Sequence, residues 1–335
     1  MRLLFITQKI NENDDDLAFV ILWIKEFINQ GASVKVICLE KGDFDGSFPV
    51  FSLGKEKGFK KIKRIFIFLK LIFSLDYDRV FVHMNPEYVT LGGWYWFLSR
   101  KPIYLWYTHY TTHIHLWISG ILCKRMFAAT PQSLPQYEGN PKKTIVGHGI
   151  DIDFWKDGIP KENNASPFDL VSVHRICRSK RLELGILTLK YLPEEYTLTV
   201  YGRDVEKDYY AELEALVKKE GLRERVIFKG PVSMGNLKNI YPSYRVMINM
   251  ARETIDKTML EGMIFGIYPV TTPRNSKAIG LSICPNSENP EDIAKFILSG
   301  ELSRYKANQL RDIVEEGHSL KSLVGKIGKL IAEDN

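Results

Sequence analysis

The alternation of short apolar segments with helical patterns constrains the fold of this chain most, and it occurs twice. In the first half, the apolar segments are "RLLFIT", "SVKVICL", "FPVFSL", "RVFVHM" and "IYLWYTH". In the second half, "DLVSVHR", "YTLTVYG", "RVIFKG" and "VMINMA" alternate with helical stretches in the same way, and "YPVTT" and "IGLSICP" follow. Strands that alternate with helices predict a parallel sheet with helices on both faces. We therefore expect an α/β protein with two doubly wound lobes.

The length of 335 residues also suits two domains of ordinary size. The polar stretch "KDGIPKENNASP", which contains Pro and Asn, is typical of a linker. We expect a first domain over 1–150, a second over 151–318, and a C-terminal helix over 319–335 that packs back toward the first domain. Open parallel sheets bind ligands beyond the carboxyl ends of their strands, so we expect a cleft enzyme.

Composition excludes several other classes of protein. A net charge of +6 is modest for this length, which argues against a nucleic-acid partner. The four cysteines are far apart and form no CxxC pair, which favours a reduced, cytoplasmic location. No apolar run reaches the roughly 18 residues of a membrane span. We expect a cytoplasmic protein whose cysteines bind no metal.

Two glutamates stand eight positions apart in "ETIDKTMLEGMIFG", which follows the apolar segment "VMINMA". Glu253 lies in the turn before a helix expected to begin near Lys257, and Glu261 lies about one turn inside that helix. Carboxylates at these positions can accept hydrogen bonds from the hydroxyls of a sugar and a ribose. The alternative is that both are solvated helix charges.

Basic residues cluster where the first strand of the second lobe ends, in "VHRICRSKRLE". The guanidinium of Arg175 and the ammonium of Lys180, next to a helix start, are suited to a diphosphate. A solvated basic turn is the alternative. The turn from Phe228 to Val232, in "VIFKGPV", can offer an apolar wall to a flat base, although such turns also occur without a ligand.

The order of these pieces resembles glycosyltransferase family four, which has the GT-B fold of two Rossmann-like domains facing a central cleft, over nearly the whole chain. "IVGHGIDIDFW" is similar to the family's "NGID...F", and Arg175 and Lys180 match the cations of its "GRL...KG" motif. "VIFKGPV" matches its "V.F.G.V" segment, and Glu253 with Glu261 match its E-x7-E pair. His109, which closes "IYLWYTH", matches a histidine that ends a strand of the first domain.

The resemblance implies a role for each matching residue. Arg175 and Lys180 would hold the diphosphate and stabilise its charge as the glycosidic bond breaks. Glu253 and His109 would contact the donor sugar, and Glu261 would bind the nucleotide ribose. The remaining donor-binding residues would be Phe228, Lys229, Gly230 and Val232 at the base, together with Gly202, Thr254, Ile255, Asp256 and Lys257.

The family retains the anomeric configuration and needs no metal or other cofactor. The resemblance therefore implies a retaining transferase that uses a UDP- or GDP-sugar to build a cell-surface polysaccharide or glycoconjugate. The chain departs from the family where "EGFG" becomes Glu253-Thr254-Ile255-Asp256, and His174 and Arg181 also replace glycines. A non-catalytic sugar-nucleotide-binding protein and a nucleotide-sugar epimerase stay open as alternatives.

A basic amphipathic stretch distinguishes the first half. Between Lys55 and Lys70 there are seven basic residues and one acid, interleaved with apolar residues at helical spacing. Such a helix suits an anionic membrane surface, and a helix with a solvated basic face is the alternative. Four tryptophans lie nearby in "GGWYWFLSRKPIYLWYTHYTTHIHLW", and most of these aromatic residues are expected in the core. We hypothesise a peripheral enzyme with a glycan or lipid-linked acceptor.

Overall fold

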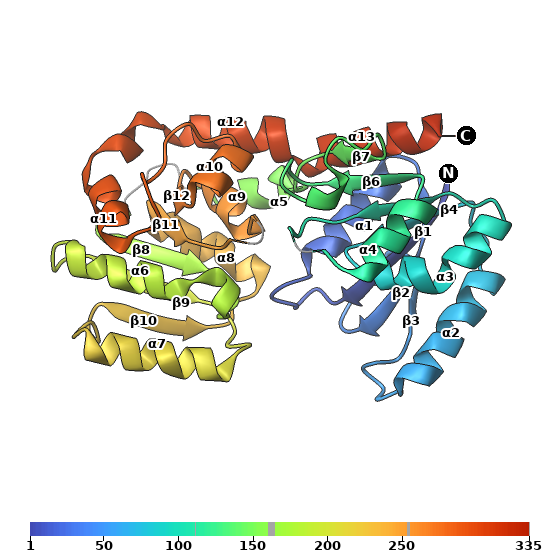
Figure 1. The fold of residues 1–335 in the computed structure, drawn as a ribbon, viewed down its shortest axis with the longest axis horizontal. Helices are drawn as coiled ribbons and strands as arrows, with labels where there is room; N and C mark the ends of the chain where they lie inside the picture. Colours follow the sequence, from blue (N-terminus) through green and yellow to red (C-terminus); the bar gives the residue numbers. More distant parts are fainter. Residues whose placement is uncertain (111, 160–164, 253–254, 335) are drawn as a thin grey trace. The chain divides into compact units, whose positions relative to one another are not determined.

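The computed structural model describes residues 1–110, 112–159, 165–252 and 255–334. Its contacts divide the chain into two units, each with one parallel sheet (Figure 1). The first unit comprises Met1–Gly149 and Leu320–Asn335, and the second comprises Ile150–Ser319.

The first unit is built on a seven-stranded sheet in the order β3-β2-β1-β4-β5-β6-β7, with parallel pairing. Phe5 in β1, an interior strand of the sheet, pairs with Val36 on one side and Phe81 on the other. The strands are β1 (Arg2–Ile10), β2 (Ser33–Lys41), β3 (Val50–Ser52), β4 (Arg79–His83), β5 (Ile103–Trp106), β6 (Arg125–Ala128) and β7 (Lys143–Ile145).

Helices bury both faces of this sheet because its strands are apolar on both sides. Along β1, Leu3 and Phe5 join one core cluster, and Leu4 and Ile6 join the other. The first cluster lies under α1 (Phe19–Asn29) and α13 (Leu320–Glu333). The second lies under α2 (Lys61–Ser74), α3 (Pro86–Leu98) and α4 (Ile114–Leu122), and a short 3-10 helix, η1 (Pro135–Tyr137), completes the unit.

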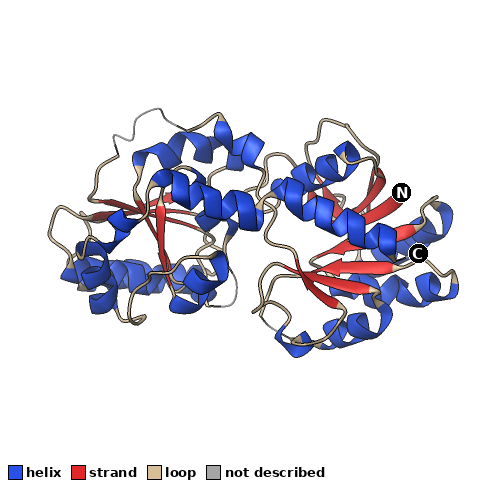
Figure 2. Ribbon diagram, turned by 90° about the horizontal axis from the view of Figure 1, so that it is seen from above, coloured by secondary structure: helices blue, strands red, loops and turns tan. Residues whose placement is uncertain are grey.

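The second unit has a five-stranded parallel sheet in the order β10-β9-β8-β11-β12. Its strands are β8 (Asp169–Val173), β9 (Thr197–Tyr201), β10 (Val226–Gly230), β11 (Val246–Asn249) and β12 (Tyr268–Thr271). Helices cover both faces of the sheet (Figure 2). They are α5 (Ile152–Lys156), α6 (Leu182–Thr188), α7 (Lys207–Lys219), α8 (Met234–Ile240), α9 (Lys257–Ile264), α10 (Pro273–Ile279), α11 (Pro290–Leu298) and α12 (Ala307–His318), with short 3-10 helices η2 (Arg178–Lys180), η3 (Leu189–Tyr191), η4 (Tyr241–Ser243) and η5 (Glu301–Arg304).

One apolar segment differs from the strand rhythm. "YPVTT" contains β12, but "IGLSICP" forms no strand. Its first residue, Ile279, ends α10, and Gly280 follows as the C-cap with φ of +95°. A glycine in the left-handed region is a common way to end a helix. Among the described residues, no helix combines the length and apolarity needed to cross a bilayer.

Candidate functional site

The carboxyl ends of the strands in the second unit gather the candidate donor residues. His174 and Arg175 follow β8, Gly202 follows β9, and Gly230 ends β10. The backbone N–H of Gly202 donates to the Gly230 carbonyl at 2.8 Å, and the His174 N–H donates to the Tyr201 carbonyl at 3.1 Å. A Cβ on Gly202 would lie 1.8 Å from the His174 carbonyl oxygen. Only glycine therefore fits where these strand ends meet.

Lys180 and Asp256 form a buried ion pair at this edge. Lys180 ends η2, which lies between β8 and α6, and only 4% of the residue is exposed. Its Nζ contacts Oδ1 of Asp256, the residue before α9. Asn249, the last residue of β11, donates from Nδ2 to the other carboxylate oxygen at 2.7 Å. An ammonium has three donors, so Lys180 can hold Asp256 and a phosphate oxygen together.

The charge states at this pair follow from its surroundings. Burial alone would raise the pKa of Asp256, but Lys180 attracts the carboxylate and holds the pKa below its ordinary value. Burial lowers the pKa of neighbouring His174, which is therefore neutral at pH 7. Its Nδ1 lies 3.0 Å from the Arg175 carbonyl oxygen, which can only accept, so the ring proton is on Nδ1.

The remaining cations of the turn differ in their surroundings. Arg175 is exposed directly beyond β8. Arg181 has a φ of +55°, a conformation that costs a non-glycine residue about 1 kcal/mol. This conformation explains why the family motif that the turn resembles has a glycine at the position of Arg181. Its guanidinium contacts Glu288, which also binds Arg252 at 3.2 Å. The guanidinium of Arg181 is therefore already paired within the protein, with a carboxylate that it shares with Arg252.

Glu261 lies inside α9 with only 6% of its surface exposed. The hydroxyl of the fully buried Tyr241 donates to Oε2 of Glu261 at 3.3 Å. Burial raises the pKa of Glu261, and Lys257, one turn earlier on the helix, opposes this shift. Burial in turn lowers the pKa of the half-buried Lys257. Thr258 anchors this end of α9 to β8 by donating from Oγ1 to the Val173 carbonyl at 2.6 Å.

The expected base-binding turn lies at the end of the edge strand β10. Phe228 is half-buried, with its ring centroid 5.1 Å from that of Tyr210, and Lys229 is exposed. Gly230 has a φ of +77°, and the pairing with β9 shifts register between Phe228 and Gly230. Val232 is half-buried beyond this turn. The turn thus combines partly exposed apolar side chains with the exposed residues Lys229 and Pro231.

Four residues that the sequence assigned to the donor site are not found among the exposed residues that the structure describes at this edge of the second sheet. Glu253 and Thr254 fall outside the described residues, whereas Ile255, which follows them, is buried in the core of the second unit. His109 belongs to the first unit, just beyond the carboxyl end of β5, and is half-buried with its ring 5.5 Å from that of Tyr107. In the described ranges, His, Cys, Asp and Glu form no group of three or more that could hold a metal.

Sequence reasoning missed two residues that position the others. Asn249 holds Asp256, and Thr258 ties α9 to β8. The sequence signal for Asn249 was weak: Asn249 is the one polar residue within the apolar segment "VMINMA".

Comparisons with known proteins agree on the fold. Residues 153–281 match the family model described as glycosyl transferases group 1. This range runs from α5 to just beyond α10 and includes the Lys180–Asp256 pair. No curated protein matches the sequence.

Solved structures match over almost the entire chain. The Anabaena protein HepE, in a complex with UDP and glucose, is 16% identical with a TM-score of 0.78, covering 99% of this chain and 100% of its own. A glycosyltransferase from Rickettsia africae is 12% identical with a TM-score of 0.79, covering 99% and 98%. The lipopolysaccharide outer core galactosyltransferase WaaB is 16% identical with a TM-score of 0.72, covering 99% and 100%.

The predicted α/β architecture of the GT-B type is therefore confirmed. The match of residues 153–281 to the group 1 model also confirms the expected enzyme class, a glycosyltransferase. Membership of family four and the roles of individual residues stay predictions.

Proposed function

We propose that this protein is a retaining glycosyltransferase of family four that transfers a sugar from a UDP- or GDP-sugar to a hydroxyl of a glycan or lipid-linked acceptor. One observation carries the proposal: a buried lysine, Lys180, lies at the carboxyl edge of the sheet inside the group 1 domain. The exposed Arg175 belongs to the same turn. HepE, with which the chain shares its fold, has been crystallised with UDP and UDP-glucose.

Transfer breaks the bond between the sugar C1 and the diphosphate oxygen, and the bonding electrons leave with the diphosphate. Arg175 and Lys180 would stabilise the charge that accumulates there, which is electrostatic catalysis by preorganised cations. The acceptor oxygen forms its bond to C1 on the same face of the sugar, and its proton leaves with the diphosphate. Because these cations supply the positive charge, we propose that no metal or other cofactor is needed.

Donor recognition is assigned to the neighbouring elements. Glu261 would accept hydrogen bonds from the ribose, and the turn from Phe228 to Val232 would contact the base. Gly202 would allow the close approach of the strand ends on which the diphosphate turn is built. Glu253 and His109 stay proposed contacts of the donor sugar.

The acceptor and the location follow from the first unit. The basic helix α2 supports a place at the cytoplasmic face of a membrane, where a lipid-linked acceptor would be within reach. Products would then be cell-surface polysaccharides or glycoconjugates.

A sugar-nucleotide-binding protein without transfer activity is the second candidate. Lys180 is already paired with the Asp256 carboxylate, which offsets the positive charge that would stabilise a leaving diphosphate. Release of nucleoside diphosphate, measured with and without a panel of glycan and lipid-linked acceptors, separates the two. A transferase releases it faster when its acceptor is present, and NMR of the product then reports whether the anomeric configuration is retained. Donor binding without release under every condition would overturn the transferase in favour of a binder, and acceptor-free interconversion of the donor sugar would indicate an epimerase.

A further inference from the structure

The outer faces of α2, α3 and α4 expose an unusual concentration of large apolar side chains. Nine of the sixteen large apolar residues that are exposed in the described ranges lie on these three helices, with exposed fractions between 50% and 78%. Single exposed apolar residues are ordinary, but contiguous patches mark interaction sites.

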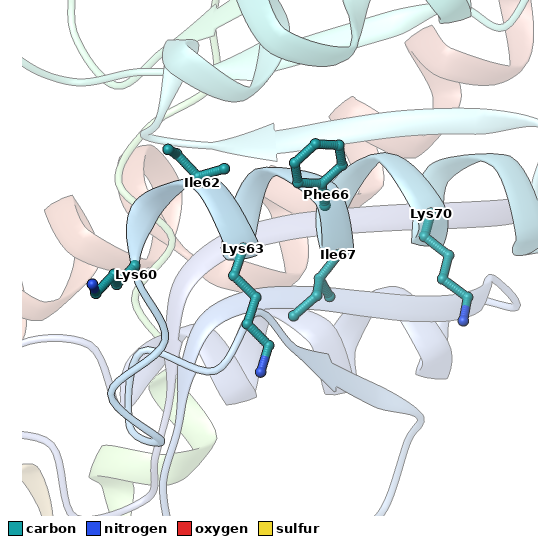
Figure 3. Close-up of a pocket in the computed structure, with 6 residues that line it drawn as sticks. All are labelled: Lys60, Ile62, Lys63, Phe66, Ile67 and Lys70. Atoms are coloured by element: carbon teal, nitrogen blue, oxygen red, sulfur yellow. The ribbon is translucent and has the colours of Figure 1, made fainter.

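On α2, the exposed apolar residues form one stripe with basic residues beside it. Ile62, Phe66 and Phe73 share a face of the helix and are all at least half exposed. Lys63 and Lys70 lie next to this stripe. Figure 3 shows Ile62 and Phe66 pointing to one side of α2 and Lys63 and Lys70 to the other. These four residues, together with Lys60 and Ile67, line an open groove of about 480 Å³.

The apolar surface continues across the two neighbouring helices. Phe73 of α2 packs edge-on against Tyr95 of α3, with ring centroids 4.5 Å apart, and α3 packs against α4 (Figure 1). At the end of α3, Phe97 and Leu98 are exposed by 71% and 72%. We call the exposed apolar residues of α2, α3 and α4, from Ile62 to Ile121, the three-helix face.

On α4, Ile114, Trp117 and Ile121 recur at intervals of three and four residues, so they form one exposed stripe. Two of the four tryptophans singled out in the sequence belong to the three-helix face: Trp94 and Trp117 are about half exposed, whereas Trp96 and Trp106 are buried. Exposed tryptophan at the border of an apolar surface is typical of a membrane interface.

The charged residues around the three-helix face are mostly basic, which favours an anionic partner. The exposed cations on or directly beside these helices are Lys60, Lys61, Lys63, Lys70, Arg100 and Lys124. Glu87 is the one acid that the sequences of the three helices contain, and the exposed Asp76, which follows α2 by two residues, pairs with Arg2. A second copy in a two-fold dimer would place these cations against the same cations, which disfavours self-association.

We propose that the three-helix face inserts its apolar side chains into an anionic lipid bilayer, while the surrounding lysines and arginine contact the headgroups. This deepens the proposed membrane location by adding α3 and α4, and it rests on the first unit alone. Binding then requires both the apolar residues and the cations. A neutral bilayer offers the cations no anionic headgroups, and a solely electrostatic contact leaves the apolar side chains in water.

The test is flotation of the full-length protein with vesicles of phosphatidylcholine, with and without phosphatidylglycerol. Wild type is expected to float with the anionic vesicles only. Lys61→Gln/Lys63→Gln/Lys70→Gln should lower its partition coefficient by about 100-fold, from the contribution of each cation near the surface. Phe66→Ser/Phe97→Ser/Ile121→Ser should lower it by about tenfold or more, even at low salt.

A matched control makes the same kind of change on the second unit. Tyr191, Val205 and Leu298 are exposed by 43% to 49%, and their triple replacement by Ser should leave flotation unchanged. If the apolar triple variant unfolds, the single variant Ile121→Ser replaces it in the flotation test. Quenching of tryptophan fluorescence by brominated lipids then reports insertion, since Trp94 and Trp117 lie on the face.

Three outcomes would overturn the proposal. Wild type that stays unbound to anionic vesicles would exclude a bilayer as the partner. Flotation that survives loss of the apolar residues would show electrostatic contact without insertion. A concentration-dependent dimer that only the apolar triple variant loses would assign the face to a second copy. Because nucleotide binding by the second unit is measured separately by thermal shift, failure here leaves the proposed donor site unaffected.

Discussion

Lys180 and Asp256 lie 76 positions apart in the sequence and meet in a buried ion pair at the carboxyl edge of the second sheet. Sequence reasoning assigned both residues to the donor site but did not predict the contact between them. The contact depends on how η2 and the start of α9 are placed by β8 and β11, and local sequence patterns carry no such information. Asp256 replaces a glycine of the resembling motif, so a donor diphosphate would share the ammonium with a carboxylate.

The Asp256→Asn variant should lose about 3 kcal/mol of the free energy of unfolding at pH 7, because Lys180 is left buried without its charged partner. The folded-state pKa of Asp256 is depressed, so its contribution is complete above the unfolded-state pKa of about 4 and disappears as the pH falls through the folded-state value. Urea denaturation of both proteins should therefore show a difference that narrows in acid.

The control for this prediction is Asp153→Asn. Asp153 pairs with Lys156 on the surface of α5, where an ion pair contributes about 0.5 kcal/mol or less. A stability difference for Asp256→Asn that is the same at pH 7 and well below pH 4 would contradict the assigned charge state.

Replacement of Arg175 by Ala should lower kcat/KM for transfer by about tenfold to several hundredfold, since a charge-assisted contact to the leaving group is worth roughly 1.5 to 3 kcal/mol or more. Lys180→Met should have a similar effect and avoids a cavity. Arg178→Ala is the matched control, because Arg178 belongs to the same turn but is exposed and pairs with Glu212. Full turnover by Arg175→Ala would refute its role.

At the scale of elements, the strand rhythm and most helices could be predicted because both periodicities are local. The helix expected near Lys257 begins there. The segment "IGLSICP" resembles a strand in its apolar residues but forms none, because its first residue ends α10 and Gly280 caps that helix. The left-handed conformation of Arg181 and the exposure of Phe97 depend on tertiary packing, which the sequence pattern does not encode.

Gly202→Ala should destabilise the second unit by about 1 to 3 kcal/mol and weaken nucleotide binding, because a Cβ would meet the His174 carbonyl and displace the turn that holds Arg175. Gly235→Ala is the opposite case. A Cβ there meets nothing within 4 Å, and Gly235 lies in the first turn of α8, so alanine should stabilise by up to about 0.5 kcal/mol. Chemical denaturation with and without nucleotide measures the stability and the nucleotide binding of each variant. Equal stability of the two variants would contradict the predicted clash between a Cβ at position 202 and the His174 carbonyl.

At the scale of the whole molecule, the chain returns to its first unit at the end. Leu323, Val324 and Ile327 of α13 are fully buried in the same core cluster as Trp23 of α1. Asp334 accepts from Nε and Nη2 of Arg125 at 2.6 and 2.7 Å, which ties the last turn to β6. The C-terminal segment is therefore part of the core of the first unit.

Leu323→Ala should lower the stability of the first unit by about 2 to 5 kcal/mol through lost burial and the cavity it leaves. Lys329→Ala, on the exposed side of the same helix, should change it little. Thermal unfolding followed by the fluorescence of the buried Trp23 and Trp106 measures the effect. If Leu323→Ala unfolds at the wild-type temperature, α13 does not stabilise the unit as its burial indicates.

The most direct test of the account is a thermal-shift panel of UDP, GDP, ADP, CDP and their sugar conjugates, because a ligand that binds only the folded state raises its stability by mass action. We predict that one nucleotide raises the Tm of wild type and of Glu316→Ala, a control acid exposed on α12, but not of Glu261→Ala. If no nucleotide stabilises wild type, or if Glu261→Ala responds as fully as wild type, the donor site at the carboxyl edge of the second sheet is contradicted.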